Sequence, residues 1–531
     1  MLYEMAKRHD VWPGEDYSGS SCRGAIQGWY NTGVCRDASW KYVAKRPGHL
    51  TVTRAKEARS NTIGAYYRIK KNIVDMHAAL NEVGALYVSA KVHQGWQRPT
   101  GGEISYSTNA KMLGGHAFAV VGYNDKGFWV QNSWGPSWGK SGLALWLYED
   151  WKDNVKDAWV VQLALPTPQL YSRRSVGSGV TGGSQVGVSS SVRRDEIAGH
   201  FVHIDDGQFH TNGKYWSDLQ DVRETARLVA QSNHYKHLMI YAHGGLNSVK
   251  ASANRIASMK DTFLKNGIYP YHFMYDTGLL EEIKDIVLGK KAESEERTAG
   301  FTDWTDWLIE KATHRLGRAV WREMKQDAHG AFRRQTSPGT LVLKEFVKAF
   351  KKTGKSLNIH VVGHSTGCIL AGHLLDALCG VGAKVPRIKT TSLMAPATTI
   401  DFFKASLLPH LRATGFGVDT MKIYNLIDEL EKDDNVAKVY RKSLLYLVSK
   451  AFEEESAAPI LGMQRYSKGI EKAKPGKLEV LYSKGSDSAS AKTSSTSHGG
   501  FDNDPNTMNS VLKTILGTAP GHPFTKEILN Y

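Results

Sequence analysis

The sequence predicts an α/β protein in two domains, in which the larger, C-terminal domain has a mostly parallel sheet flanked by helices. Three observations lead to this prediction. The chain of 531 residues has room for two to four domains of roughly 150 residues each. A Gly/Ser-rich stretch divides it, and beyond that stretch short apolar runs alternate with helix-like segments. Such alternation is typical of a parallel sheet covered by helices on both faces.

Composition excludes several classes of protein. Hydrophobic residues make up 41% and charged residues 23%, which is ordinary for a globular protein and excludes a disordered one. No apolar run approaches the roughly 20 residues that cross a bilayer, so we expect no transmembrane segment. The first residues contain acids and bases and no apolar signal core, and four cysteines favour a reducing compartment. We therefore expect a cytoplasmic protein, or a secreted one if a leader has been lost with a missing N-terminal part.

The net charge is strongly basic, at +16. The basic residues occur in scattered pairs such as Lys70-Lys71 and Arg333-Arg334 and form no long run or nucleic-acid-binding motif. This distribution predicts no specific nucleic-acid partner and at most a weak attraction to anionic surfaces.

The domain boundary follows from the Gly/Ser-rich stretch, which runs from Ser172 to Ser191. Such a segment cannot bury enough surface to order itself and is typical of a linker. We predict an N-terminal domain over residues 1–165, a linker over 166–195 and a C-terminal domain over 196–531.

Five buried strands are predicted in the C-terminal domain, at His237–Ala242, Leu357–Val362, Lys389–Met394, Met421–Leu426 and Leu478–Tyr482. Residues 277–334 do not fit this alternation. They are rich in charge and contain Trp304, Trp307 and Trp321, and they predict a helical insertion that acts as a lid and shapes an apolar pocket.

A Gly-His-Ser-Thr-Gly motif, Gly363 to Gly367, follows one of these strands directly and begins the predicted helix Cys368–Leu378. The order of strand, sharp turn and helix is the context in which G-x-S-x-G presents a nucleophile. It raises the Ser365 hydroxyl above the sheet at a helix N-terminus, where the dipole favours a developing oxyanion.

The partners of such a serine are predicted from their positions. The N–H of Thr366 and the loop at Gly244 and Gly245, which ends an upstream strand, are expected to bind the oxyanion. His498 lies between the last predicted strand and the last predicted helix and is the expected base. Asp428, which follows the strand ending at Leu426, is the expected acid; Glu429, Asp433 and Asp434 are its rivals.

On these motifs, residues 235–520 resemble an α/β-hydrolase. The resemblance implies a serine esterase or lipase, a carboxylic ester hydrolase in which Ser365 attacks the carbonyl, His498 transfers the proton and Asp428 orients the imidazole. It also implies a small-molecule or lipid-like ester as substrate. No metal-ligand cluster or phosphate-binding loop is present in the sequence, so we expect no metal and no cofactor.

The N-terminal domain contains Gly114-Gly115-His116 at the start of an apolar strand and Asn132-Ser133-Trp134-Gly135 after the next. This pattern resembles the base-and-orienter half of a papain-like cysteine peptidase. The resemblance implies a smaller α+β domain in which His116 is the base and Asn132 its orienter.

A nucleophile is missing from that pattern. No Cys-Gly-Ser-Cys-Trp-like motif occurs; Cys22 precedes a predicted helix, Arg23–Tyr30, but its surroundings resemble the segment downstream of the family's nucleophile. We therefore expect a partial, non-catalytic papain-like domain and a chain that begins inside the fold. Two alternatives remain: a cysteine peptidase that uses Cys22, His116 and Asn132, or a non-enzymatic binding protein with relic sites. Buried, unreactive positions are expected for the other cysteines, Cys35, Cys368 and Cys379.

Overall fold

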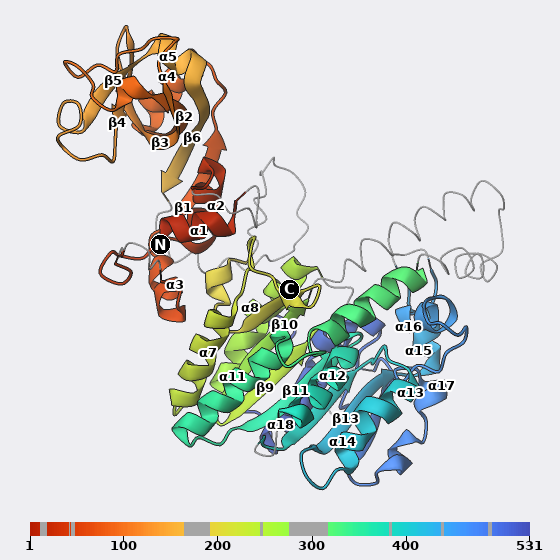
Figure 1. The fold of residues 1–531 in the computed structure, drawn as a ribbon. Coiled ribbons are helices and arrows are strands. Elements are labelled where there is room, and N and C mark those ends of the chain that lie inside the picture. The colour runs from red at the N-terminus through yellow and green to blue at the C-terminus, as the bar shows by residue number, and fades with distance from the viewer. Residues whose placement is uncertain are drawn as a thin grey trace, which may run out of the picture. The chain divides into compact units, whose positions relative to one another are not determined.

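The structure is a computed structural model that describes residues 1–10, 19–41, 43, 48–163, 192–244, 248–275, 317–381, 385–436, 440–486 and 491–531. The chain divides into two compact units (Figure 1). Unit 1 takes in the described residues up to 163, and unit 2 takes in nearly all of those from 196 onward.

Unit 1 contains a six-stranded sheet in the order β1-β6-β2-β3-β4-β5, and every neighbouring pair is antiparallel. Its strands are β1 (Ile63–Arg68), β2 (Leu86–His93), β3 (Met112–Tyr123), β4 (Gly127–Gln131), β5 (Leu143–Leu147) and β6 (Val155–Leu163). Its helices are α1 (Leu2–Arg8), α2 (Cys22–Thr32), α3 (Val52–Ala58), α4 (Ile73–Val83), α5 (Tyr148–Asn154) and the short η1 (Gln94–Trp96).

The two faces of this sheet pack against different segments. Side chains alternate along a strand, so Val88 and Ala90 of β2 lie on one face and Tyr87 and Ser89 on the other. The first face carries the main core of the unit, built around Trp96, Phe118, Phe128, Val130 and Trp146. The second face carries a smaller cluster of Cys22, Ile26, Ile63 and Trp159, with Tyr87 packed against it.

Unit 2 contains an eight-stranded sheet in the order β14-β13-β12-β11-β9-β10-β7-β8. All neighbouring pairs are parallel except β7 and β8. The strands are β7 (Phe201–Asp205), β8 (Gln208–Phe209), β9 (His237–Ala242), β10 (Ile268–Tyr275), β11 (Asn358–His364), β12 (Ile388–Met394), β13 (Val418–Leu426) and β14 (Leu478–Ser483). The five strands expected from the sequence are present within a residue or two of their predicted ends at β9, β11, β12 and β14, and β13 begins three residues earlier.

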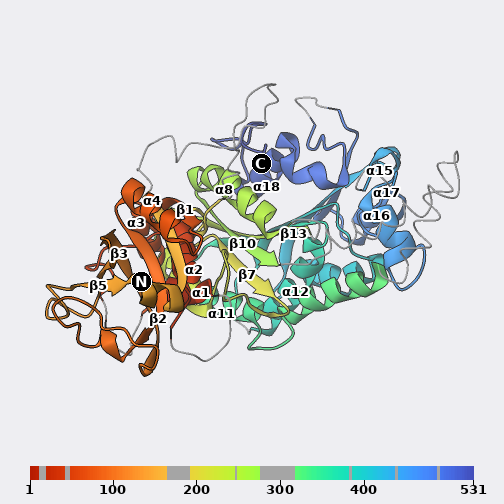
Figure 2. The ribbon, with the colours of Figure 1, turned by 90° about the horizontal axis from the view of Figure 1, so that it is seen from above.

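Helices cover both faces of this sheet, as Figures 1 and 2 show. Helices α7 (Leu219–Gln231), α11 (Pro338–Thr353) and α12 (Gly367–Gly380) pack on one face, against alternate residues of β9 such as Leu238 and Ile240. Helices α8 (Val249–Lys265) and α18 (Pro505–Leu516) pack on the opposite face, against Met239 and Tyr241. Burial on both faces explains why these strands are continuous apolar runs.

Shorter elements complete unit 2 near the carboxyl edge of the sheet and between its strands. They are α13 (Ile400–Phe402), η3 (Phe403–Leu407), α14 (Leu408–Arg412), α15 (Asp428–Asp433), α16 (Leu444–Leu447), η4 (Val448–Phe452), α17 (Gln464–Ser467), η5 (Ile470–Ala473) and η6 (His498–Asn503). The short η2 (Arg194–Glu196) has its first two residues in unit 1 and its third in unit 2.

The expected lid and linker fall largely outside the described residues. Of the predicted insertion, residues 317–330 form a helix and Trp321 is fully buried, donating its indole N–H to Glu453 Oε1 at 2.7 Å. Trp321 therefore packs in the core, while Trp304 and Trp307 lie outside the described residues. Of the predicted linker, residues 192–195 are described, and Arg194 and Asp195 are buried, so this end of it is not a solvated spacer.

No helix in the described part of the chain is long and apolar enough to cross a bilayer.

Candidate active sites

Ser365 lies at the turn between β11 and α12 in a conformation that only a well-supported backbone maintains. Its φ angle is +53°, in the left-handed region that L-residues rarely adopt. The amide of Ser365 donates to the carbonyl of Met394 at 2.8 Å, and its carbonyl accepts from Ala397 at 3.1 Å. These bonds to the end of β12 hold the strained turn in place.

The two glycines of the motif allow the close approach of backbone segments at this turn. A Cβ on Gly367 would lie 2.1 Å from the carbonyl oxygen of Ala242, at the end of β9. A Cβ on Gly363 would lie 3.1 Å from the Cα of Cys368, in the first turn of α12. Glycine at position 367 is thus a steric requirement, and glycine at 363 relieves a tight contact.

His498 lies next to Ser365, although the two residues are far apart in the sequence. The Nε2 atom of His498 lies 2.8 Å from Ser365 Oγ, and the two residues are only 5% and 3% exposed. Burial first, and then the charge of His364, lowers the pKa of His498 to about 3. The imidazole is therefore neutral near pH 7, which is the form that can accept a proton from the hydroxyl.

Asp428 does not hold this imidazole. Its carboxylate accepts from Tyr446 Oη at 2.8 Å and pairs with Lys432 at 2.7 Å and Arg465 at 3.3 Å. The expectation that Asp428 orients His498 is corrected by these contacts, because both carboxylate oxygens are engaged elsewhere. Among the described residues, His498 Nδ1 is buried without a hydrogen-bond partner.

The rivals of Asp428 divide into one that contacts His498 and two that do not. Asp434 Oδ2 accepts the backbone N–H of His498 at 2.7 Å, and burial raises the pKa of Asp434 despite that bond. Glu429 and Asp433 are exposed side chains of α15. No feature of the sequence distinguishes Asp434 from the other acids of this loop.

The residues expected to bind an oxyanion are only partly described. Thr366 is fully buried, and its hydroxyl lies 3.0 Å from Tyr275 Oη. Gly244 follows β9 and its carbonyl accepts from His243 Nδ1 at 2.9 Å, whereas Gly245 lies outside the described residues. The pairing of two N–H donors at this site therefore stays a prediction.

His116 and Asn132 form a hydrogen-bonded pair in unit 1. Neighbouring strands β3 and β4 bring them together, and His116 Nε2 lies 2.8 Å from Asn132 Oδ1. Since the amide oxygen also accepts the N–H of Ser133 at 2.8 Å, it acts as an acceptor, and His116 Nε2 carries the proton. Nδ1 is then the atom that can take up a proton. The ring of Trp134, which is 41% exposed, lies 4.7 Å from the ring of His116.

Cys22 lies on the other face of the sheet from His116. His116 pairs with Ala90 across β2 and β3 and packs near Phe118, on the face of the main core. Cys22 belongs to the cluster on the second face and interacts with Ser89 and Tyr87. Burial raises the pKa of its thiol, although it begins α2, so Cys22 is neither positioned nor ionised to act as the nucleophile of His116.

The remaining cysteines largely match the expectation of buried, unreactive residues. Cys35 and Cys368 are buried, and burial raises the pKa of both thiols. Cys379 is exposed, contrary to the prediction. No group of His, Cys, Asp and Glu side chains within the described ranges is arranged to hold a metal ion.

Comparison with known proteins identifies unit 1. Residues 14–156 match the model of the papain family of cysteine proteases. A curated relative, a gut-specific cysteine proteinase of Caenorhabditis elegans, is 27% identical over 140 residues, which cover 25% of this chain and 41% of the relative. This chain therefore spans less than half the length of that relative. Residues 14–156 form a papain-like cysteine-peptidase domain.

Solved structures of cysteine proteases give weaker matches. Xylellain of Xylella fastidiosa is 24% identical, with 30% of this chain and 68% of that chain covered and a TM-score of 0.27. A cysteine protease of Carica candamarcensis is 18% identical, with 27% and 68% covered and a TM-score of 0.23.

These comparisons correct the function predicted from the sequence. The matching family and the curated relative are cysteine proteases. The prediction of a carboxylic ester hydrolase with a small-molecule or lipid-like ester substrate is therefore wrong, and the alternative prediction, a papain-like cysteine peptidase, is the better supported one.

Proposed function

We propose that unit 1 binds peptides as a papain-type cysteine-peptidase domain, in which His116 has the position of the base and Asn132 that of its orienter. The observation that supports this most directly is the hydrogen bond of 2.8 Å between His116 Nε2 and Asn132 Oδ1. It fixes the ring and its tautomer, so that Nδ1 faces the position from which a thiol would give up its proton. The ring of Trp134 lies beside that of His116, with 4.7 Å between the ring centroids.

The proposed function assigns no catalytic role to Cys22, because its thiol is buried on the opposite face of the sheet. Cys35, the other cysteine of unit 1, is also buried, beside Met1, and donates its backbone N–H to the Met1 sulfur. Hydrolysis of the papain type requires a thiolate at His116 Nδ1. Peptide binding at the His116 face is therefore the part of the function that this unit performs by itself.

The test uses short peptides that carry a benzophenone, photo-crosslinked to the full chain and mapped by mass spectrometry. We expect crosslinks around His116 and Trp134, and a Trp134→Ala variant with a several-fold weaker yield. Tyr67→Ala is the matched control, since Tyr67 is an exposed aromatic residue of β1, 65% exposed, at the edge of the same sheet. Crosslinks spread over the surface, or equal yields in both variants, would reject peptide recognition at this face.

A parallel reaction with a thiol-directed peptidyl epoxide addresses Cys22. We expect no adduct at Cys22. An adduct there, lost in Cys22→Ser and in His116→Ala alike, would instead establish a complete Cys22–His116 peptidase and would contradict the geometry described above.

We propose, as a second candidate site, that Ser365 and His498 form an activated serine in unit 2. The specific support is the combination of the positive φ of Ser365 with the 2.8 Å contact between its Oγ and His498 Nε2. A neutral imidazole at that distance can take the hydroxyl proton as the oxygen attacks an electrophile. The proposal concerns this reactivity and the oxyanion groups at Thr366, Gly244 and Gly245, and it makes no assignment to ester cleavage.

A fluorophosphonate tests this second proposal directly. Ser365 Oγ attacks phosphorus, fluoride leaves, and the hydroxyl proton passes to His498 Nε2. We expect one phosphonyl adduct on Ser365, absent in Ser365→Ala and reduced at least about 100-fold in rate in His498→Ala. Ser392→Ala, which removes a buried serine of β12, is the control and should keep the adduct. An unlabelled wild-type protein would end the proposal.

A further inference from the structure

Most of the hydrogen bonds that hold His498 are made by its main chain. Its imidazole makes one hydrogen bond, whereas its backbone N–H and C=O each bond to the side chain of another residue. Nε2 contacts Ser365 Oγ, and Nδ1 has no hydrogen-bond partner among the described residues. The backbone N–H of His498 donates to Asp434, and its backbone carbonyl accepts from His364.

His364 connects His498 to the turn that carries Ser365. It is the residue immediately before Ser365, and its Nε2 lies 3.0 Å from the carbonyl oxygen of His498. Since a carbonyl oxygen only accepts, Nε2 of His364 carries the proton. His498 is thereby bonded to two consecutive residues of the motif, to His364 through the main chain and to Ser365 through the ring.

A buried ion pair between Arg255 and Asp502 lies beside the other ring nitrogen of His364, which has no hydrogen-bond partner among the described residues. His364 Nδ1 lies 3.3 Å from Asp502 Oδ2, and the same carboxylate oxygen lies 2.7 Å from Arg255 Nε of α8. Tyr241 of β9 donates its hydroxyl to Asp502 at 3.0 Å. Burial alone would raise the pKa of Asp502, but the charge of Arg255 and then that of His364 outweigh it, so this pKa lies below the usual range. A charged carboxylate therefore persists behind His364.

Asp434 holds the other side of the same peptide unit. It follows α15, and its Oδ2 atom lies 2.7 Å from the N–H of His498. The side chain also accepts through Oδ1 from the N–H of Asn435 at 2.8 Å, which fixes the direction of the carboxylate. Asp434 is 2.7 Å from the main chain of the base, whereas no contact joins it to the ring.

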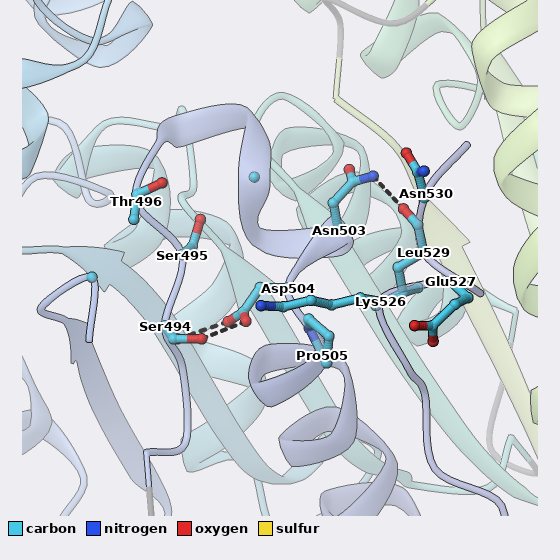
Figure 3. Close-up of a pocket in the computed structure, with 12 residues that line it drawn as sticks. Ser494, Ser495, Thr496, Asn503, Asp504, Pro505, Lys526, Glu527, Leu529 and Asn530 are labelled. Carbon is cyan, nitrogen blue, oxygen red and sulfur yellow. Dashed lines mark hydrogen bonds between the residues drawn. The ribbon is translucent and has the colours of Figure 1, made fainter. Parts of the chain in front are cut away.

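The loop that carries His498 is anchored at both ends, beside a pocket (Figure 3). Asp504 accepts from the N–H of Ser494 at 2.7 Å and from its hydroxyl at 2.6 Å. Asn503 donates to the carbonyl of Leu529 at 2.6 Å, and Figure 3 shows both connections. Because the loop ends are fixed, the two bonds to the main chain of His498 can set the direction of its side chain.

We infer that His364 and Asp434 are positioning residues that form a main-chain clamp on His498, and that this clamp supplies the orientation that a carboxylate bonded to Nδ1 would otherwise supply. This inference rests on the proposed reactivity of Ser365. Under it, Asp434 acts as a hydrogen-bond acceptor and not through its charge, and His364 acts as a hydrogen-bond donor.

Matched variants separate a clamp from a charged orienter. In Asp434→Asn the amide oxygen can still accept the N–H of His498, whereas Asp434→Leu has no acceptor. In His364→Gln the amide can still donate to the carbonyl of His498, whereas His364→Leu cannot. His373→Gln, a change to a histidine of α12 that makes no contact with His498, serves as the control.

The measurement is the rate of phosphonylation of the full chain by the fluorophosphonate, resolved into the maximal inactivation rate and the half-saturating concentration. We expect the maximal rate to fall at least about 10-fold in both Leu variants, since misplacement of a catalytic group by about 1 Å can cost 100-fold. The Asn and Gln variants should stay within about 3-fold of the wild type, and half-saturation should change little in all four.

Two results would overturn the clamp. One is an Asp434→Asn variant as slow as Asp434→Leu, which would show that the charge is needed. The other is a His364→Leu variant that folds and reacts at the wild-type rate. If either Leu variant fails to fold, the Ala variant at the same position, which also lacks the hydrogen-bonding group, takes its place in the comparison.

Hydrogen exchange of the His498 amide keeps this test separate from the reactivity of Ser365. We expect that amide to be protected in the wild type and in Asp434→Asn and to exchange at least about 10-fold faster in Asp434→Leu. An unreactive wild-type protein with this exchange pattern would refute the activated serine alone, whereas equal exchange in all three would refute the clamp.

Discussion

The two units each contain a histidine suited to act as a base, and they complete its surroundings in opposite ways. In unit 1, His116 is partly exposed and its ring is fixed by the side chain of Asn132, while Cys22 lies on the other face of the sheet. In unit 2, His498 is buried, a serine hydroxyl lies 2.8 Å from it, and its main chain is held by His364 and Asp434. The match to a known family covers the first unit, whereas the close pair of a serine hydroxyl and a histidine lies in the second, so family resemblance and chemistry have to be judged separately.

Sheet topology explains the difference. In the antiparallel sheet of unit 1, the base and its orienter come from sequential strands and are 16 residues apart. In the parallel sheet of unit 2, the carboxyl ends of β11, β13 and β14 meet at one edge, which brings together residues 133 positions apart. The His116–Asn132 pair is local in sequence and can therefore form when other parts of a site are absent. The Ser365–His498 pair forms only when the strands of the parallel sheet are assembled.

The largest expected loss of stability comes from adding one methyl group at the turn between β11 and α12 in unit 2. Gly367→Ala would place a Cβ 2.1 Å from the carbonyl oxygen of Ala242, and we expect it to destabilise unit 2 by about 3 kcal/mol or more. Gly115→Ala in β3 is the counterpart in unit 1: a Cβ there has no atom within 4 Å, so the change should cost less than about 0.5 kcal/mol. Urea unfolding with hydrogen exchange reports each unit separately. Equal stability of the two variants would show that the turn relaxes freely.

A smaller effect is expected from the buried hydrogen bond between Asp150 and His93 in unit 1. Asp150 is fully buried and lies 2.7 Å from His93 Nε2, and its other oxygen accepts from Asn154 at 2.7 Å. Asp150→Ala leaves two buried polar groups unsatisfied and should destabilise unit 1 by about 2–4 kcal/mol. Asp153→Ala, an exposed change on the same helix, is the control and should cost less than about 1 kcal/mol. Similar losses in the two variants would mean that the buried pair adds nothing.

The sequence predicted the strands of unit 2 well where burial on both faces leaves an uninterrupted apolar run. The strand β10, which lies between β9 and β7, was not predicted; Pro270 and His272 interrupt its apolar pattern, although both residues are accommodated in the buried strand. The Gly-x-Ser-x-Gly turn could be predicted because close backbone contacts require glycine at 367 and favour it at 363, and both glycines are visible in the sequence.

The sequence did not predict which acidic residue contacts His498. Asp428 is the first residue of the short helix α15, and Asp434 follows its last residue. The position of Asp428 after a strand favoured it in the sequence, but that position does not determine which acid reaches His498. Tertiary contacts decide: Tyr446, Lys432 and Arg465 bind Asp428, and Asp434 reaches the main chain of His498. His364 occupies a variable position of the G-x-S-x-G motif, and only the fold gives it a role.

Acidification should destabilise unit 2 through its buried histidines, of which His360 is an example. Burial first, then the charges of His237 and Lys389, lowers the pKa of His360 to about 3, against 6.5 in the unfolded chain. Between these values the unfolded state binds more protons, so the contribution of His360 is fully present above pH 6.5 and is lost as the pH falls toward 3. From pH 7 to pH 5 this amounts to about 2 kcal/mol.

Replacing His360 by Asn or by Leu should therefore flatten the dependence of the free energy of unfolding on pH between 7 and 5, by a similar amount in both variants. Their stabilities at pH 7 should differ, because only Asn can keep a hydrogen bond to Thr390, which now lies 2.8 Å from His360 Nδ1. Urea titrations at the two pH values measure the slope. A slope equal to that of the wild type would mean that His360 titrates normally in the fold.

The smallest expected effect concerns the orienter of unit 1. Asn132→Ala removes the acceptor of His116 Nε2–H at a partly exposed position, where water can replace it, so the free energy of unfolding should fall by less than about 1 kcal/mol. The change should appear in the ring instead: nitrogen NMR of His116 should report mainly the Nε2–H tautomer in the wild type and a mixture in the variant. An unchanged tautomer in Asn132→Ala would show that the strand and Trp134 alone orient His116. His116 would then resemble His498, whose ring nitrogen Nδ1 also has no side-chain partner among the described residues.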